Sequence, residues 1–112
     1  MLLRAMREYL GSWGLAVVRG RSMQPTLYDG DRLLVRHAAS ARVGDVVVVR
    51  LPDGVVAVKR AAFRADGGWW VERDNPGEGV DSWLVGAISD DRVLAVARAR
   101  VWPPRRVPLR RR

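Results

Sequence analysis

From residue 31 onward, short apolar runs alternate with sequences that form turns. The turn sequences are Gly44-Asp45, Pro52-Asp53-Gly54 and Asp66-Gly67-Gly68. The runs between them are rich in valine, which favours strands over helices. They predict six strands, at residues 31–36, 46–51, 55–64, 69–72, 83–88 and 93–101. Strands at hairpin spacing pair in antiparallel fashion, so we expect a mostly β fold with little helix.

The residues before position 18 follow a different pattern. Their apolar side chains recur at helical spacing, and Arg4 and Arg7 fall between them. The pattern predicts a short amphipathic N-terminal helix over residues 1–16, with its apolar face formed by Leu2, Leu3, Met6, Leu10 and Trp13. We expect this helix to pack against the domain, or alternatively to make weak contact with a membrane surface. The apolar stretch is too short to span a bilayer, which needs about 20 residues.

The length and composition of the chain limit the kinds of fold and chemistry that it can have. A chain of 112 residues predicts a single domain, here residues 17–104, followed by an Arg-rich C-terminal tail over 105–112. There is no cysteine, which excludes disulfides, thiolate catalysis and zinc sites built on cysteine. The one histidine, His37, lies in a polar stretch that predicts a surface loop. With one histidine and no cysteine, we expect neither a metal site nor a cofactor.

The net charge of +8 is concentrated at the C-terminal end. Residues 98–112 hold seven arginines and no acid, whereas residues 1–97 hold thirteen bases and twelve acids, a net charge of +1. Such a tail can contact nucleic acid or anionic lipid. A nucleic-acid-binding domain more often spreads its basic side chains over a folded face. We therefore expect a solvated terminus and no specific nucleic-acid partner.

Lys59 is the only lysine among the twenty basic residues. Arginine stays protonated near neutral pH, whereas desolvation can lower the pKa of a lysine until it acts as a base. In a chain this rich in arginine, the scarcity of lysine alone does not indicate a function. Lys59 is distinguished by its location in the apolar run 55–63. On a strand it shares a face with Val55, Ala57 and Ala61. These small apolar neighbours predict a buried amine.

Thirty-seven residues before Lys59, Ser22 lies in a bend that is bounded by Gly20 and Pro25. A neutral lysine can take the proton of a serine hydroxyl while the oxygen attacks a carbonyl. Gly20 would let the backbone approach the substrate, and the N–H groups near Gly20 and Ser22 could hold the oxyanion. Pro25 would make the turn rigid. Ser22 and Lys59 are therefore the two residues that nucleophilic catalysis by a Ser/Lys dyad requires.

The same residues fall into ordered boxes that resemble those of the signal peptidase I family of Ser/Lys proteases. The boxes are residues 22–27, Gly30-Asp31, residues 44–48, residues 58–60, Asp74-Asn75 and Asp81-Ser82. The resemblance implies a coiled β-sheet, Ser22 as nucleophile, Lys59 as general base, and a protein substrate bound as an extended strand with small residues near the cut. On the same resemblance, the residues that support the dyad or the substrate strand are Met23, Pro25, Asp74, Asn75, Asp81 and Ser82.

Three positions depart from the family pattern. Arg73 replaces a glycine, Gly79 replaces a serine that orients the lysine, and Trp83 replaces an arginine. The sequences Trp69-Trp70-Val71-Glu72, Asp74-Asn75-Pro76 and Trp102-Pro103 resemble short soluble members that mature nickel-type superoxide dismutases. We therefore expect a cytoplasmic endopeptidase that removes an N-terminal propeptide, with a nickel superoxide dismutase precursor as the best candidate substrate.

Other interpretations remain open. A general signal peptidase of secreted proteins would be associated with a membrane. A self-cleaving repressor shares the dyad and the sheet, but neither Ala-Gly nor Cys-Gly precedes Ser22. A non-catalytic β module could bind nucleic acid through the tail and stack bases on its five tryptophans. Deleting residues 105–112 should abolish binding by such a module and leave a protease with its dyad.

Overall fold

The computed structural model describes residues 13–77, 82–105 and 107–111, which form one antiparallel sheet of seven strands. The strands are β1 (Trp13–Val17), β2 (Arg32–His37), β3 (Val46–Arg50), β4 (Val56–Ala65), β5 (Gly68–Glu72), β6 (Ile88–Ser89) and β7 (Val93–Trp102). A short helix, α2 (Ser82–Val85), precedes β6, and a 3-10 turn, η1 (Asp90–Arg92), follows it. The predicted mostly β, antiparallel fold is confirmed.

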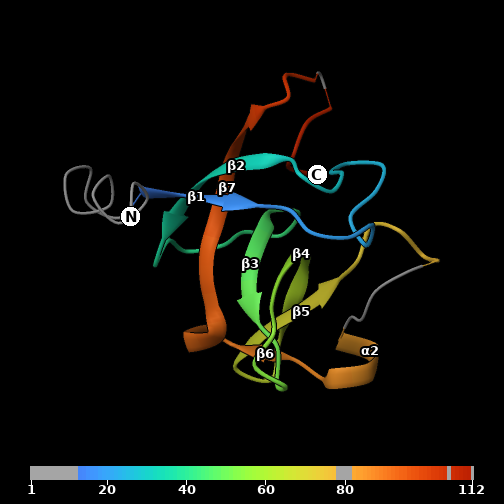
Figure 1. The fold of residues 1–112 in the computed structure, drawn as a ribbon. Coiled ribbons are helices and arrows are strands. Elements are labelled where there is room, and N and C mark those ends of the chain that lie inside the picture. Colours follow the sequence, from blue (N-terminus) through green and yellow to red (C-terminus); the bar gives the residue numbers. More distant parts are fainter. Residues whose placement is uncertain (1–12, 78–81, 106, 112) are drawn as a thin grey trace.

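The strand order is β1-β2-β7-β3-β4-β5-β6, so β7 and β3 lie in the middle (Figure 1). Successive side chains of a strand point to opposite faces. Val46 and Val48 therefore pack into one core cluster, and Val47 and Val49 into a second. Burial on both faces explains why this strand is an unbroken run of valines. The first cluster also holds three residues of the segment between β1 and β2, Val18, Met23 and Leu27.

Two sequence predictions of secondary structure are wrong. The helix expected over residues 1–16 cannot include 13–16, because these residues belong to β1, where five residues pair with β2. Tertiary pairing outweighs the helical spacing there, and residues 1–12 lie outside the described residues. The strand expected over 83–88 is mostly α2, with only Ile88 in β6. Gly86, with φ of +80°, separates the two elements because a strand cannot continue through that backbone angle.

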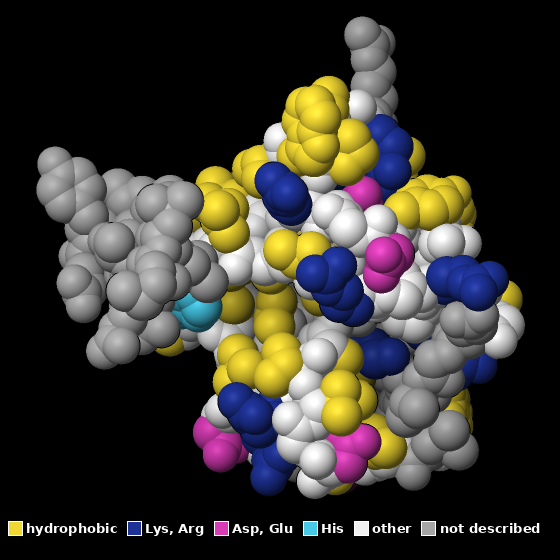
Figure 2. Space-filling model, in the orientation of Figure 1, with side chains coloured by type: hydrophobic (Ala, Val, Ile, Leu, Met, Phe, Trp, Pro, Cys, Tyr) yellow, Lys and Arg dark blue, Asp and Glu magenta, His cyan; other side chains and the backbone are white. Residues whose placement is uncertain are grey.

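The environment of the one histidine also differs from expectation. His37 ends β2 and is half-buried, not part of a surface loop. Among the tryptophans, Trp69 is buried, whereas Trp83 and Trp102 are 72% and 59% exposed. Hydrophobic side chains, Trp102 and Val101 among them, gather at the end of β7, at the top of Figure 2. In the described part of the chain, no helix is long and apolar enough to cross a membrane.

The Arg-rich tail folds back onto the body of the molecule (Figure 1). Leu109 packs against the first core cluster, and the Arg111 N–H donates to the Gly44 carbonyl at 2.9 Å. Arg105 forms an ion pair with the buried Asp31. The expectation of a solvated terminus is therefore wrong for Arg105 and Leu109, which are half-buried, whereas residues 107, 108, 110 and 111 are exposed even though Arg110 and Arg111 form ion pairs with buried acids. The physical reason is that a buried carboxylate such as Asp31 is costly without a cationic partner, and the tail supplies one.

Candidate active site

Ser22 lies in a compact turn between β1 and β2, which we call the nucleophile turn (residues 20–27). Two backbone hydrogen bonds close it, from Gln24 N to Arg21 O at 3.1 Å and from Leu27 N to Met23 O at 2.9 Å. The side chains of Met23 and Leu27 are 1% and 0% exposed and hold the turn against the first core cluster. Ser22 itself is half-buried. The apolar side of the turn is thus held in the core, and Ser22 lies between this buried side and the solvent.

Asp74 and Asn75 hold the nucleophile turn from outside. The Asn75 backbone N–H donates to the Ser22 carbonyl at 2.8 Å, and its side-chain amide donates to the Arg21 carbonyl at 2.9 Å. The Thr26 hydroxyl donates to the Asp74 carboxylate at 2.6 Å. Adjacent residues after β5 therefore bind both ends of the turn. The sequence pointed to these two residues through the Asp-Asn box, and the structure places Asn75 at Ser22 and Asp74 at Thr26.

Arg60 and Asp74 form a buried ion pair behind the turn. Arg60 Nη2 lies 2.5 Å from Asp74 Oδ2 and Nε lies 3.2 Å from Oδ1, with side chains that are 6% and 1% exposed. Burial by itself would raise the pKa of Asp74. Hydrogen bonds from Arg60 and Thr26, together with the charges of Arg60 and Arg111, outweigh burial and hold that pKa below its ordinary value. Asp74 is therefore an anion that organises the turn.

Lys59 is 3% exposed, so the buried amine that its neighbours predict is observed. Its partner across the strand pair is Val47, which belongs to the second core cluster, as does Ala61. Desolvation in such surroundings disfavours the charged ammonium form.

A cleft of about 260 Å³ places Ser22 beside the strand that carries Lys59. One wall is formed by Ala16, Val17 and Arg19, and the other by four consecutive residues, Val55 to Val58. Consecutive strand residues alternate between faces, so a cleft that touches all four runs along the edge of β4. Hydrophobic side chains gather below β1 on the face shown in Figure 2. The lining of the cleft includes Val58 but not Lys59, which is the next residue of β4.

The remaining predicted site residues have different surroundings. The Gly20 N–H already donates to Asp29 Oδ1 at 2.8 Å, so this donor is engaged and does not favour an oxyanion role. A Cβ at Gly20 would meet nothing within 4 Å; its φ of +82°, not a need for space, favours glycine. Pro25 is exposed and follows a cis peptide bond. Asp81 lies outside the described residues, and Ser82 begins α2.

Sequence reasoning missed Thr26 and Arg60 as parts of this site. Arg60 follows Lys59 on β4, and its side chain reaches Asp74 and Thr26. The signal in the sequence was a basic residue, Arg60, inside the apolar run 55–63, together with the acid of the Asp-Asn box. A second cleft of about 450 Å³, beside Trp69 and the Arg64–Asp90 ion pair, contains none of the predicted site residues.

A comparison with known protein families identifies the family of the chain. Residues 8–97 match the Peptidase S24-like family, and the chain belongs to that family. The match confirms a peptidase-type fold, as expected, but it does not single out signal peptidase I or the nickel superoxide dismutase maturation proteases. No curated protein matches the chain.

Proposed function

We propose that the protein is a serine endopeptidase with Ser22 as nucleophile and Lys59 as general base. The observation that supports the proposal is the cleft that Ser22 lines together with Val55 to Val58, the four residues that precede the buried Lys59 in the sequence. Membership of a peptidase family supports the same reaction class. Family membership alone is insufficient because such families include non-catalytic members, so the proposal rests on the residues of the cleft.

The strand pairing supports a substrate in extended conformation. Among the described strands, β1 stands at the end of the sheet order and pairs with β2. The ladder between β4 and β5 begins at Arg60, so residues 56–59 of β4 pair on the β3 side alone. The cleft lies between these two free edges. An extended peptide can bond to such edges through its backbone, which is the mode called β-augmentation.

The lining of the cleft also supports the expected preference for small residues near the cut. Apart from Ser22 and Arg19, every residue that lines it is alanine or valine. The volume of about 260 Å³ has to hold several substrate residues, which favours small side chains. Aliphatic walls give large polar side chains no partner for their hydrogen bonds.

In the proposed reaction, the neutral Lys59 amine takes the Ser22 proton as Oγ forms a bond to the scissile carbonyl carbon. The C–N bond then breaks, and the ammonium returns the proton to the leaving amine. Water next attacks the acyl-enzyme with Lys59 again as base, which releases the acid and regenerates Ser22. Because the Gly20 N–H bonds to Asp29, the Ser22 N–H is the remaining predicted donor to the oxyanion.

At a finer level we propose that the reaction removes a propeptide from a cytoplasmic precursor. The Asp74-Asn75-Pro76 sequence, part of the resemblance to nickel superoxide dismutase maturation proteases, is the segment that holds the nucleophile turn. We expect cleavage of such a precursor at one position after a small residue. Mass spectrometry of the precursor after incubation with the protein tests this proposal. A precursor that remains intact, together with cleavage of signal sequences, would favour general signal peptidase activity.

The reaction class can be tested before a natural substrate is known. Quenched fluorescent peptides with alanine, serine or glycine near the centre should be cut by the wild-type protein and not by Ser22→Ala. Ser40→Ala is the matched control, because Ser40 is an exposed serine that lines the second cleft. Equal loss of activity in both variants, or cleavage by Ser22→Ala at the wild-type rate, would refute the assignment of Ser22.

A further inference from the structure

Two residues of the tail, Leu109 and Arg111, contact the buried Arg60–Asp74 pair behind the nucleophile turn. Arg60 Nη1 donates to the Gly44 carbonyl at 2.8 Å and also to the carbonyl of Leu109. The Gly44 carbonyl accepts a second hydrogen bond, from the Arg111 N–H at 2.9 Å. The tail, Gly44 and Arg60 thus share one set of hydrogen bonds.

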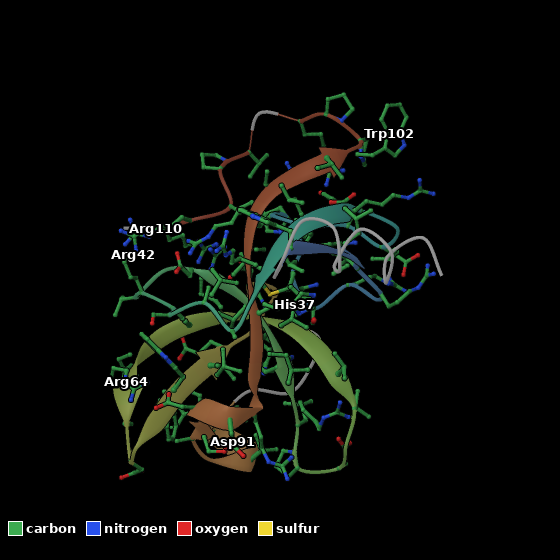
Figure 3. The ribbon with its side chains drawn as sticks, turned by 90° about the vertical axis from the view of Figure 1, so that its left-hand side faces the viewer. His37, Arg42, Arg64, Asp91, Trp102 and Arg110 are labelled. Carbon is green, nitrogen blue, oxygen red and sulfur yellow. The ribbon has the colours of Figure 1, made fainter. Side chains whose placement is uncertain are left out.

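The side chains of Arg110 and Arg111 bind two buried acids next to these hydrogen bonds. Arg111 Nη2 lies 3.6 Å from Asp74 Oδ2, and Arg110 Nε lies 3.1 Å from Asp45 Oδ1. Figure 3 shows Arg110 beside Arg42, in the loop where Asp45 accepts a hydrogen bond from the Arg42 N–H. Asp45 and Asp74 are 3% and 1% exposed at their side chains. The tail is therefore a structural part of the folded domain.

The approach of the tail to Gly44 is too close for any side chain. A Cβ at Gly44 would overlap the Arg111 carbonyl. Gly54 has nearly the same backbone angle, with φ of +88° against +91° at Gly44, but a Cβ there would meet nothing within 4 Å. A comparison of Gly44→Ala with Gly54→Ala therefore separates two effects. Both substitutions would strain the backbone, but only Gly44→Ala would displace the tail.

From the tail, a short series of contacts leads to Ser22. Leu109 and Arg111 contact Arg60 and Asp74, and Asp74 accepts a hydrogen bond from Thr26 within the nucleophile turn. The residue after Asp74, Asn75, binds the carbonyl of Ser22. The residues that line the substrate cleft take no part in these contacts, apart from Ser22 itself.

We propose that the C-terminal tail is a positioning element for Ser22, acting through Arg60, Asp74 and Asn75. This reverses the sequence-based expectation that the dyad is independent of residues 105–112. The kinetic consequence of this inference rests on the proposed function. Removal of the tail contacts should lower kcat and leave KM nearly unchanged, because the cleft that binds the substrate stays in place.

The test compares Gly44→Ala with Gly54→Ala by two measurements at a temperature where both proteins are folded. The first is hydrogen exchange of the Asn75 amide, which reports the bond to Ser22 and requires no activity. The second is the kinetics of cleavage of the best quenched peptide. We expect faster exchange at Asn75 and a fall in kcat of about tenfold to a hundredfold in Gly44→Ala alone, the scale of a misplaced catalytic group.

A second variant covers the case in which Gly44→Ala does not fold. A protein truncated after Pro108 loses the Leu109 carbonyl and the Arg111 contacts, and Leu109→Ala is its control, because it loses packing but keeps the carbonyl. A synthetic peptide of residues 105–112 should restore kcat to the truncated protein and do nothing for Leu109→Ala.

Unchanged exchange at Asn75 in Gly44→Ala and in the truncated protein would overturn the proposal. So would a kcat in these variants equal to that of their controls. If wild-type protein cut no peptide, or Ser22→Ala cut as well as wild type, the proposed function would fail. The exchange measurement would still decide whether the tail positions the nucleophile turn.

Discussion

Replacement of Asp74 by alanine tests the buried ion pair on which the nucleophile turn depends. Asp74→Ala removes both hydrogen bonds from Arg60 and the one from Thr26. Arg60, which is 6% exposed at its side chain, is then left as a buried charge without its carboxylate partner. Removing one member of a buried ion pair typically costs about 3–5 kcal/mol. Arg60 keeps the carbonyls of Gly44 and Leu109, so we expect the lower end of this range, about 3 kcal/mol.

Thermal and urea denaturation measure this loss of stability. For a domain of this size, 1 kcal/mol corresponds to about 4 °C, so Asp74→Ala should lower the Tm by about 12 °C. Asp90→Ala is the matched control, because the Arg64–Asp90 pair has the same 2.5 Å separation with side chains that are 51% and 60% exposed. Exposed pairs contribute little, so the control should unfold close to the wild-type temperature.

A double variant separates the cost of the unpaired charge from the loss of packing. Asp74→Ala with Arg60→Met removes both charges and should recover at least half of the lost stability, since burial of methionine carries no desolvation penalty. If Asp74→Ala were no less stable than Asp90→Ala, the pair would not hold the turn. A double variant no more stable than the single one would show that the buried charge is not the cause.

Two predictions concern protonation. Because the pKa of Asp74 lies below its ordinary value of 3.8, its contribution to stability is complete above that value and is lost as the pH falls through the lower folded-state pKa. The unfolding free energy contributed by Asp74 should thus be constant from pH 7 to about 5 and decline below about 4, a decline that Asp74→Ala should weaken in an acid titration followed by tryptophan fluorescence. Lys59→Arg should fold and lose activity by about 10²–10⁴-fold, because guanidinium cannot accept the Ser22 proton, and the wild-type rate should rise with pH. Cleavage by Lys59→Arg at the wild-type rate would contradict a Ser/Lys mechanism.

The sequence predicted those parts of the fold that are governed by local pattern. Valine-rich runs between glycine turns predicted β3, β4 and β5 to within one or two residues at each end. The burial of Lys59 followed from its apolar neighbours, because a strand between two covered faces has no polar surroundings. β1 was missed since Trp13 to Val17 have the spacing of a helix, and only the pairing with β2 makes them a strand.

The arrangement around Ser22 depended on contacts that local pattern cannot reveal. Arg60 reaches Thr26, 34 residues earlier, and Leu109, 49 residues later. The charges counted from the sequence showed only that the tail has an excess of arginine and that the rest of the chain is nearly neutral. They could not show that Asp31, Asp45 and Asp74 are buried carboxylates, which the tail arginines accompany. The number of charges was available from the sequence, but their burial was not.

Covalent labelling of Ser22 tests the central claim most directly. A peptidyl fluorophosphonate that ends in alanine reacts irreversibly with an activated serine, and tryptic mapping with mass spectrometry locates the adduct. We predict a single adduct on Ser22 in the wild-type protein, labelling that becomes faster as the pH rises, and none in Lys59→Arg. An adduct on Ser40 in place of Ser22, or labelling of Ser22 at equal rates in wild type and Lys59→Arg, would contradict the account.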